Sequence, residues 1–221
     1  IEQKKEQKKG FMQKLLTGEV RLSKNKENWK EEELERVLEN IVGGGTPSRK
    51  NPNYYNGGIP WATVKDMGNE NYKDSTIENI SLEGLKNSSA KLIEKNNLII
   101  STRMGLGRCF INTVDMAINQ DLKGLYPNKS KILVEYLMYY FKLKAEDLEK
   151  KGSGSTVKGI TLSVLKKLKI YYPNLEAQQK IVDILSTVDK EIELLTKEVN
   201  HLKKQKKGLM QLLLTGKVRV K

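Results

Sequence analysis

The sequence has very few of the side chains that form disulfides or bind transition metals. Its 221 residues include one cysteine, Cys109, and one histidine, His201. A single cysteine excludes an internal disulfide and is typical of a reducing compartment, so we expect a cytoplasmic protein. A structural zinc site takes about four Cys or His ligands, and we therefore predict no metal site. Cys109 alternates with apolar neighbours, which predicts a core position in a strand.

Long apolar runs are also missing. No window approaches the roughly 18 consecutive apolar residues of a membrane-spanning helix, and no signal peptide is visible. The chain begins at Ile1, so its first stretch is interpreted as the tail of a longer helix. Hydrophobic residues make up 38% and charged residues 30% of the sequence. This composition favours one core of about 150 residues with helical extensions.

Acidic residues are outnumbered by basic ones. The net charge of +13 divides into +5 for residues 1–30, +4 for 31–175 and +4 for 176–221. Beyond Glu198 every formally charged residue is basic. Such an excess favours a polyanion, most simply nucleic acid, because binding releases counterions. Charge alone leaves a lysine-rich solvated surface as an equal alternative.

Motifs for catalysis are absent or incomplete. No P-loop is present, and Gly105-Leu106-Gly107 lacks the third glycine of a dinucleotide loop, so we expect a hairpin turn there. Residues 51–54 (NPNY) approach the Asx-Pro-Pro-aromatic tetrapeptide of amino-methyltransferases, which act on a flipped base. However, Asn53 replaces the second proline, and no strand followed by a cofactor-binding glycine loop is predicted before it. We therefore predict no catalytic residue and no cofactor, and a turn at residues 51–54.

The same sequence occurs near both ends of the chain. Residues 7–21 read QKKGFMQKLLTGEVR and residues 207–219 read KGLMQLLLTGKVR, at an offset of 198. Both copies contain Thr-Gly, which predicts a helix ended by a glycine cap. The two copies are separated by residues 22–206, so the repeat is not a solenoid, whose units follow without a gap. It indicates one unit of a two-unit pseudo-symmetric protein, or a half-molecule that pairs with itself.

Apolar residues beyond Glu176 follow a heptad, interrupted by Lys206. The predicted seam consists of Ile181, Leu185, Val188, Ile192, Leu195, Val199, Leu202, Leu209 and Leu213. This spacing predicts a coiled-coil helix about 60 Å long. So narrow a stripe needs a partner helix. The N-terminal copy matches it with Phe11 and Leu15 over only part of its length, so we expect a second chain or a missing segment to cover the rest.

The central residues alternate between short strands and helices. We predict helices over 28–42 and 132–150, a short helix capped by Thr161, and strands over 59–64, 98–102, 109–113, 117–125 and 170–172. The strand over 117–125 is broken at Asn119-Gln120-Asp121, and a loop is expected over 151–156. Because the strands come in clusters without regular crossover helices, the fold class is α+β with a mostly antiparallel sheet.

Two separated runs resemble a known family. Residues 44–48 (GGTPS) and 55–61 (YNGGIPW) resemble the opening of a target-recognition domain in the specificity subunit of type I restriction–modification systems. Residues 154–156 (GST), 168–170 (LKI) and 173–181 (PNLEAQQKI) resemble its close, which leads into a long conserved helix. The family's full subunit has two recognition domains and two long helices, so this chain resembles a half-subunit. The expected domains are a helical stub (1–22), a DNA-binding target-recognition domain (23–175) and a coiled-coil spacer (176–221).

The resemblance implies a non-catalytic role in sequence-specific DNA recognition. Each recognition domain would read one half of a split target in double-stranded DNA, and the helices would set the spacing and dock the modification subunits. Those subunits use S-adenosylmethionine to methylate adenine, and a restriction subunit supplies ATP-driven cleavage. The implied partners are these subunits and a second recognition half or a second copy, with no membrane. Three other readings stay open: a free-standing DNA-binding regulator or decoy, a helical assembly scaffold, and an intrinsic methyltransferase.

The candidate DNA contacts are polar and basic residues in loops of the central region. Arg and Lys can reach guanine O6 and N7, and Asn and Gln suit adenine N6 and N7. A loop ahead of a helix N-terminus is a natural phosphate site. The predicted DNA-binding residues are Thr46, Ser48, Arg49, Lys50, Asn53, Tyr55, Lys65, Arg103, Arg108, Asn119, Gln120, Ser155, Thr156 and Lys158. For each one singly, a plain surface role is equally consistent with the sequence.

Overall fold

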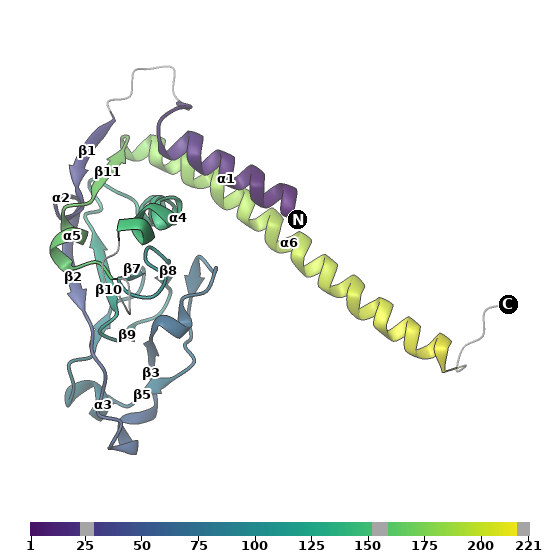
Figure 1. The fold of residues 1–221 in the computed structure, drawn as a ribbon, viewed down its shortest axis with the longest axis horizontal. Coiled ribbons are helices and arrows are strands. Elements are labelled where there is room, and N and C mark those ends of the chain that lie inside the picture. Colours follow the sequence, from purple (N-terminus) through teal and green to yellow (C-terminus); the bar gives the residue numbers. More distant parts are fainter. Residues whose placement is uncertain (23–28, 152–158, 216–221) are drawn as a thin grey trace. The chain divides into compact units, whose positions relative to one another are not determined.

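The computed structural model describes residues 1–22, 29–151 and 159–215 (Figure 1). The chain divides into two compact units, one made of residues 12–182 and the other of residues 1–11 together with residues from 183 onward. The run of polar residues at 23–26 (SKNK) predicts a short linker. This run and most of the predicted loop at 151–156 lie outside the described residues.

Short strands dominate the larger unit. They are β1 (Lys30–Glu33), β2 (Leu38–Gly43), β3 (Tyr55–Ala62), β4 (Tyr72–Lys73), β5 (Asn79–Ile80), β6 (Lys91–Ile93), β7 (Leu98–Ser101), β8 (Cys109–Asn112), β9 (Met116–Ile118), β10 (Leu122–Pro127) and β11 (Lys169–Tyr172). The helices of the chain are α1 (Glu2–Leu16), α2 (Leu34–Val37), α3 (Leu82–Lys86), α4 (Val134–Lys151), α5 (Leu162–Lys166) and α6 (Leu175–Leu214), with 3-10 turns η1 (Pro52–Tyr54) and η2 (Val64–Asp66).

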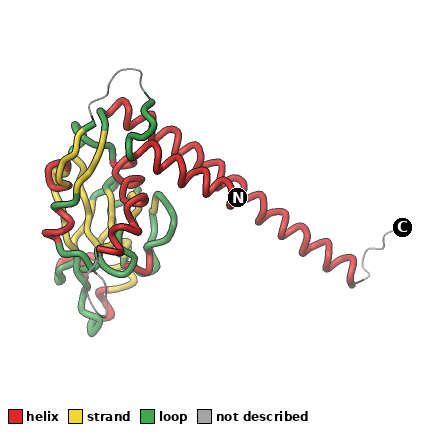
Figure 2. The backbone as a smooth tube through the Cα atoms, turned by 45° about the horizontal axis from the view of Figure 1, so that its top comes forward, coloured by secondary structure: helices red, strands yellow, loops and turns green. Residues whose placement is uncertain are grey.

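Three sheets form within the described part of this unit. A five-stranded sheet has the order β2-β10-β7-β8-β4, a four-stranded sheet has the order β5-β3-β9-β6, and β1 pairs with β11. The pairs β3–β9 and β4–β8 are parallel, and the other described pairs are antiparallel. Figure 2 shows these strands gathered in the larger unit. The predicted α+β class with a mostly antiparallel sheet is confirmed.

The core of the larger unit is formed by buried side chains from the strands of both main sheets. Ile99, Phe110, Ile118 and Leu122 are buried in one apolar cluster, and Trp61 is buried in an adjoining cluster. Helix α4 packs on β7 and β8 and buries its aromatic face. As predicted, the strand over 117–125 is broken, because the chain turns at residues 119–121 between β9 and β10.

Several other predicted elements are present. Strands β7, β8 and β11 and helix α4 occupy nearly the predicted ranges, and the hydroxyl of Thr161 accepts a hydrogen bond from the backbone N–H of Val164 to cap α5. The β7–β8 turn contains Gly105 and Gly107 with φ of 90° and 80°, which only glycine adopts easily. Gly18 follows α1 with φ of 74°, as a glycine cap requires. Gly216, the equivalent residue of the second copy, lies outside the described residues.

The helix predicted over 28–42 is wrong. Residues 30–33 form β1 and pair with β11, residues 34–37 make a single helical turn, and residues 38–43 form β2 beside β10. The i, i+3, i+4 spacing that suggested a helix does bury Leu34, Val37 and Leu38, but it is satisfied by that one turn. Long-range strand pairing then overrides local helix propensity on either side of the turn.

The smaller unit pairs the start of α1 with α6. The Nζ atom of Lys4 lies 2.8 Å from a carboxylate oxygen of Glu191, and that of Lys8 lies 2.5 Å from Asp189, so the two helices run antiparallel. Figures 1 and 2 both show α1 alongside the first part of α6. Exposure rises along the predicted seam: Leu185 and Val188 are buried, Ile192, Leu195 and Val199 are half-buried, and Leu202, Leu209 and Leu213 are exposed.

The buried position of Cys109 predicts an unreactive thiol. Its side chain is 2% exposed and lies 3.6 Å from the carbonyl oxygen of Met138 on α4. Burial raises the pKa of the Cys109 thiol to about 12, and the thiolate is the reactive form. We expect the native chain to react with a thiol reagent at pH 8 far more slowly than the urea-unfolded chain. Because the sequence has one cysteine, the absorbance change reports this site directly, and equal rates in the two states would contradict the burial.

Candidate nucleic-acid interface

The loop after β2 passes very close to the end of β9. A Cβ atom on Gly44 would collide with the backbone of Ile118, and one on Gly45 would collide with Ser89. The Gly45 N–H donates a hydrogen bond of 3.0 Å to the carbonyl oxygen of Ile118, and the Gly45 carbonyl accepts one of 3.1 Å from Trp61 Nε1. Glycine is therefore needed at both positions, because no side chain fits between these segments. This contact determines where the next residues of the loop lie.

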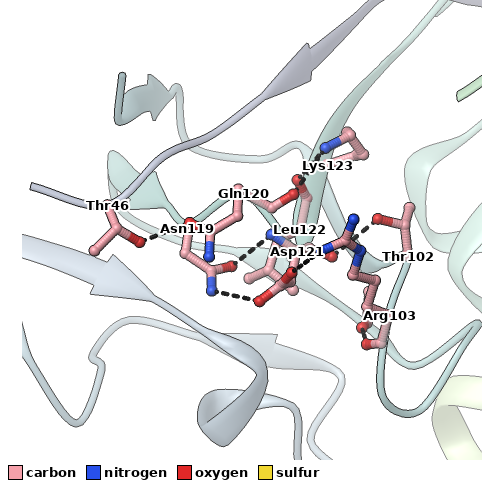
Figure 3. A network of polar contacts seen from close by, with 9 residues as sticks. Thr46, Thr102, Arg103, Asn119, Gln120, Asp121, Leu122 and Lys123 are labelled. Atoms are coloured by element: carbon pink, nitrogen blue, oxygen red, sulfur yellow. Dashed lines mark hydrogen bonds and ion pairs between the residues drawn. The ribbon is translucent and has the colours of Figure 1, made fainter. Parts of the chain in front are cut away.

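One polar cluster surrounds the β9–β10 turn (Figure 3). The hydroxyl of Thr46 donates a 2.6 Å hydrogen bond to Gln120 Oε1. A guanidinium nitrogen of Arg103 lies 3.4 Å from Asp121 Oδ1, and Asn119 Nδ2 donates to Asp121 Oδ2 at 3.2 Å. We call Thr46, Arg103, Asn119, Gln120 and Asp121 the turn cluster. Four of these five residues were predicted from the sequence as DNA contacts.

Members of the turn cluster differ in exposure. Asn119 is 6% exposed, and its Oδ1 accepts a 3.1 Å hydrogen bond from the backbone N–H of Asp121, so it shapes the turn. Gln120 and Arg103 are exposed. Lys123 donates hydrogen bonds to the carbonyls of Gln120 and Leu122, and burial lowers the pKa of its ammonium group. The exposed side chains of Gln120 and Arg103 therefore lie at a turn that is stabilised by hydrogen bonds to Asn119 and Lys123.

A second polar cluster surrounds Arg49. Its Nη1 donates a 2.6 Å hydrogen bond to Glu78 Oε2, and its guanidinium carbon lies 4.3 Å from the ring centroid of Tyr55 and 5.4 Å from that of Trp61. We call Arg49, Tyr55, Trp61 and Glu78 the Arg49 cluster. The hydrogen bond between the charged groups raises the pKa of Arg49 and lowers the pKa of Glu78. Both side chains are therefore charged at neutral pH.

The loop over residues 44–50 connects the two clusters. Thr46 bonds to Gln120 in the turn cluster, and the next residue, Pro47, accepts a 2.6 Å hydrogen bond from the Tyr55 hydroxyl in the Arg49 cluster. Both clusters belong to the larger unit. The tertiary structure thus joins candidates that are up to 74 residues apart in sequence.

Other predicted contacts lie near these clusters or apart from them. Lys65 Nζ lies 4.0 Å from a carboxylate oxygen of Glu78 and so borders the Arg49 cluster. Ser48 and Lys50 belong to the loop itself, and Arg108 lies at the β7–β8 turn. Asn53 sits in η1, where its backbone N–H donates to Asn51 Oδ1 and its carbonyl accepts from Ser81, so the predicted turn is present.

Three predicted phosphate contacts, Ser155, Thr156 and Lys158, lie outside the described residues. The residues that follow them reach the turn cluster, since Gly159 forms a backbone bridge with Arg103 and the Ile160 N–H donates to the Thr102 carbonyl at 3.0 Å. Sequence reasoning missed Trp61, Glu78 and Asp121 as members of the two clusters, and it missed Lys123 beside the turn cluster. No local spacing signals Glu78, because it is 29 residues from Arg49.

The described residues contain neither a candidate metal site nor a candidate membrane-spanning helix. No group of three or more His, Cys, Asp or Glu side chains in that part of the chain could hold a metal ion. No helix there is long and apolar enough to cross a membrane.

Comparison with known proteins assigns the chain to a family. Residues 26–204 match the family described as type I restriction modification DNA specificity domain. The chain belongs to this family. The matched residues include both clusters and more than half of α6. The resemblance found from the two sequence motifs is thereby confirmed.

The chain is similar to several specificity subunits. It is 33% identical over 190 residues to the type I restriction enzyme MjaIX specificity subunit of Methanocaldococcus jannaschii, covering 84% of this chain and 44% of that protein. It is 32% identical over 193 residues to the EcoR124I/EcoR124II specificity subunit of Escherichia coli, covering 79% of this chain and 47% of that protein. The chain thus spans about half the length of these relatives.

A solved structure supports the fold. The HsdS subunit from Thermoanaerobacter tengcongensis superposes with a TM-score of 0.64 at 22% identity, covering 96% of this chain and 52% of that chain. This likeness concerns the fold of the specificity domain and its long helix.

The close approach of the glycine loop predicts a stability effect. We expect Gly44→Ala to lower the free energy of unfolding by about 1–3 kcal/mol, because the new methyl group forces the loop away from β9. Urea unfolding followed by tryptophan fluorescence measures it. Gly58→Ala is the matched control, since nothing lies within 4 Å of a Cβ built at Gly58. Equal stability of the two variants would show that the loop tolerates a side chain.

Proposed function

We propose that this chain recognises a specific DNA sequence as the specificity subunit, or half of the specificity subunit, of a type I restriction–modification enzyme. The observation that carries the proposal is the family match over residues 26–204, which includes both polar clusters and more than half of the long helix. In this proposal the chain is non-catalytic and needs no cofactor. Modification subunits methylate the DNA, and a restriction subunit cleaves it.

The larger unit supplies the DNA contacts in this proposal. Exposed groups on the loop over 44–50 and on the turn cluster read base edges, since Arg and Gln side chains match guanine and adenine edges in the major groove. The lysines, including Lys50, Lys65 and Lys158, contact phosphates and position the domain on the duplex. The net charge of +13 supports a salt-dependent contribution to affinity. The proposed domain limits stay at residues 1–22, 23–175 and 176–221.

The long helix supplies the partner surface. Helix α6 has 40 residues and α1 has 15, so α1 can accompany only part of α6. The exposed leucines at 202, 209 and 213 continue the predicted seam beyond that part. We propose that a second recognition half or a second copy of this chain covers them, and that the modification subunits dock on the paired helices. The proposed location is the cytoplasm, where such an enzyme meets DNA.

Methylation mapping tests the DNA-recognition proposal. This chain would be co-expressed with a type I modification subunit that binds it, and N6-methyladenine would be mapped across the host genome. We expect a split motif, because each recognition unit reads one half of the target. A palindromic motif means that two copies pair, and an asymmetric motif means that a different recognition unit completes the subunit. A stable complex that yields no motif would contradict the proposal and favour a scaffold or a free-standing regulator.

The seam provides a separate test. We expect the double variant Ile192→Asp and Leu195→Asp to lose assembly, because two charges in a coiled-coil seam are poorly solvated, while the larger unit stays folded. Light scattering after size exclusion measures assembly, and circular dichroism measures folding. The control carries Thr196→Asp and Asn200→Asp, which place the same charge on exposed positions of α6. Assembly of the Ile192/Leu195 variant would show that the seam does not organise the complex.

A further inference from the structure

Glu78 is a fixed acidic partner for one edge of Arg49. The Arg49 side chain is 57% exposed, and its Nη1 donates to Glu78 Oε2 at 2.6 Å. The Glu78 side chain is more covered, at 29% exposure. One edge of the guanidinium is therefore occupied while much of the side chain still faces solvent. Nothing in the family match assigns a role to this pair.

The backbone around Glu78 is held rigidly. Its carbonyl accepts hydrogen bonds from the Trp61 N–H at 3.1 Å and from the Thr76 hydroxyl at 2.8 Å. The next residue, Asn79, begins β5, which pairs with β3 at Pro60. The residue whose carboxylate bonds to Arg49 thus directly precedes a strand that is paired with β3. A charged side chain held in this way loses little conformational entropy when it binds a ligand.

The rings of Tyr55 and Trp61 also restrict the position of the Arg49 guanidinium. The guanidinium carbon lies 4.3 Å from the centroid of the Tyr55 ring, and the Tyr55 hydroxyl is tied to the Pro47 carbonyl at 2.6 Å. A guanidinium in contact with an aromatic ring gains cation–π stabilisation, which lysine supplies less well in such a planar geometry. Carboxylate and ring together orient the guanidinium.

The negative charge of Glu78 makes Arg49 a poorer ligand for a phosphate group than for an uncharged base edge. A phosphate group near Arg49 would also approach the Glu78 carboxylate, and like charges repel. The O6 and N7 edge of guanine is uncharged and offers two acceptors, which match the parallel N–H donors of arginine. Lys65 Nζ also lies 4.0 Å from Glu78, so the three groups together carry one positive charge. Because the Glu78 carboxylate is directly beside Arg49 and repels a phosphate there, Arg49 is better suited to a base edge than to the DNA backbone.

Resting on the function proposed above, we propose that Glu78 is a positioning residue that holds Arg49 as a specificity-determining residue for one guanine of the DNA target. Glu78 does not itself contact DNA in this proposal. It acts by fixing the direction of the Arg49 donors.

The test compares methylation motifs in the complete complex. Arg49→Ala and Arg49→Lys are each expected to relax a G·C requirement at one motif position, with preference falling about tenfold or more for the alanine variant. Glu78→Gln keeps the size of the side chain and removes its charge, so it should relax the same position by a smaller factor. In the Arg49→Ala background, Glu78→Gln should cause no further change, because its effect passes through Arg49.

Controls separate positioning from a loss of folding. Glu83→Gln changes the same charge on an exposed residue of α3 five positions away and should leave the motif unchanged. Complex formation and thermal unfolding are measured for every variant. Should Glu78→Gln fail to assemble, Arg49→Lys still tests the guanine, because it alters an exposed side chain.

The outcomes distinguish this inference from the proposed function. A wild-type motif that the Arg49 variants leave unchanged would overturn the inference alone. Equal loss of methylation at all sequences would also overturn it, since that result indicates a phosphate contact or a structural role. A further effect of Glu78→Gln in the Arg49→Ala background would show that Glu78 acts independently. A wild-type complex with no motif would overturn the proposed function and this inference with it.

Discussion

The contact between the Gly44–Gly45 backbone and the end of β9 determines the geometry of the candidate interface. Two hydrogen bonds, from Gly45 to Ile118 and from Trp61 to Gly45, hold the loop against strands β9 and β3. Because Ile118 is the last residue of β9, the same contact places the β9–β10 turn beside the loop. Thr46 then reaches Gln120, and Pro47 reaches Tyr55. Without this close approach, the two polar clusters would have no common element.

Local charge in the interface differs from the charge of the whole chain. The net charge of +13 attracts polyanions in general, but Arg49 and Arg103 are each paired with a carboxylate. Exposed pairs of this kind contribute little to stability. Such an ion pair instead orients the arginine, because a guanidinium bonded to a carboxylate presents its remaining N–H donors in a defined direction. Lysines are better suited to the phosphate backbone, where position matters more than angle.

The long helix provides an independent part of the architecture. Its first half carries buried seam residues, and its second half exposes leucines between lysines. An apolar stripe of this kind is stable in water only when another helix covers it. In the proposed function, recognition and assembly therefore depend on different residues of the same chain.

Sequence patterns by themselves determined the α+β class, the break at residues 119–121, helix α4, the long helix and the family. These features depend on periodicity, glycine turns and motifs, which are local properties of the chain. Only the tertiary structure decided that residues 30–43 form strands around a single helical turn, because their pairing partners β10 and β11 are far away in sequence. The same reason explains the site: Arg49 was visible as a candidate, but its partner Glu78 and the burial of Asn119 depend on how distant strands pack.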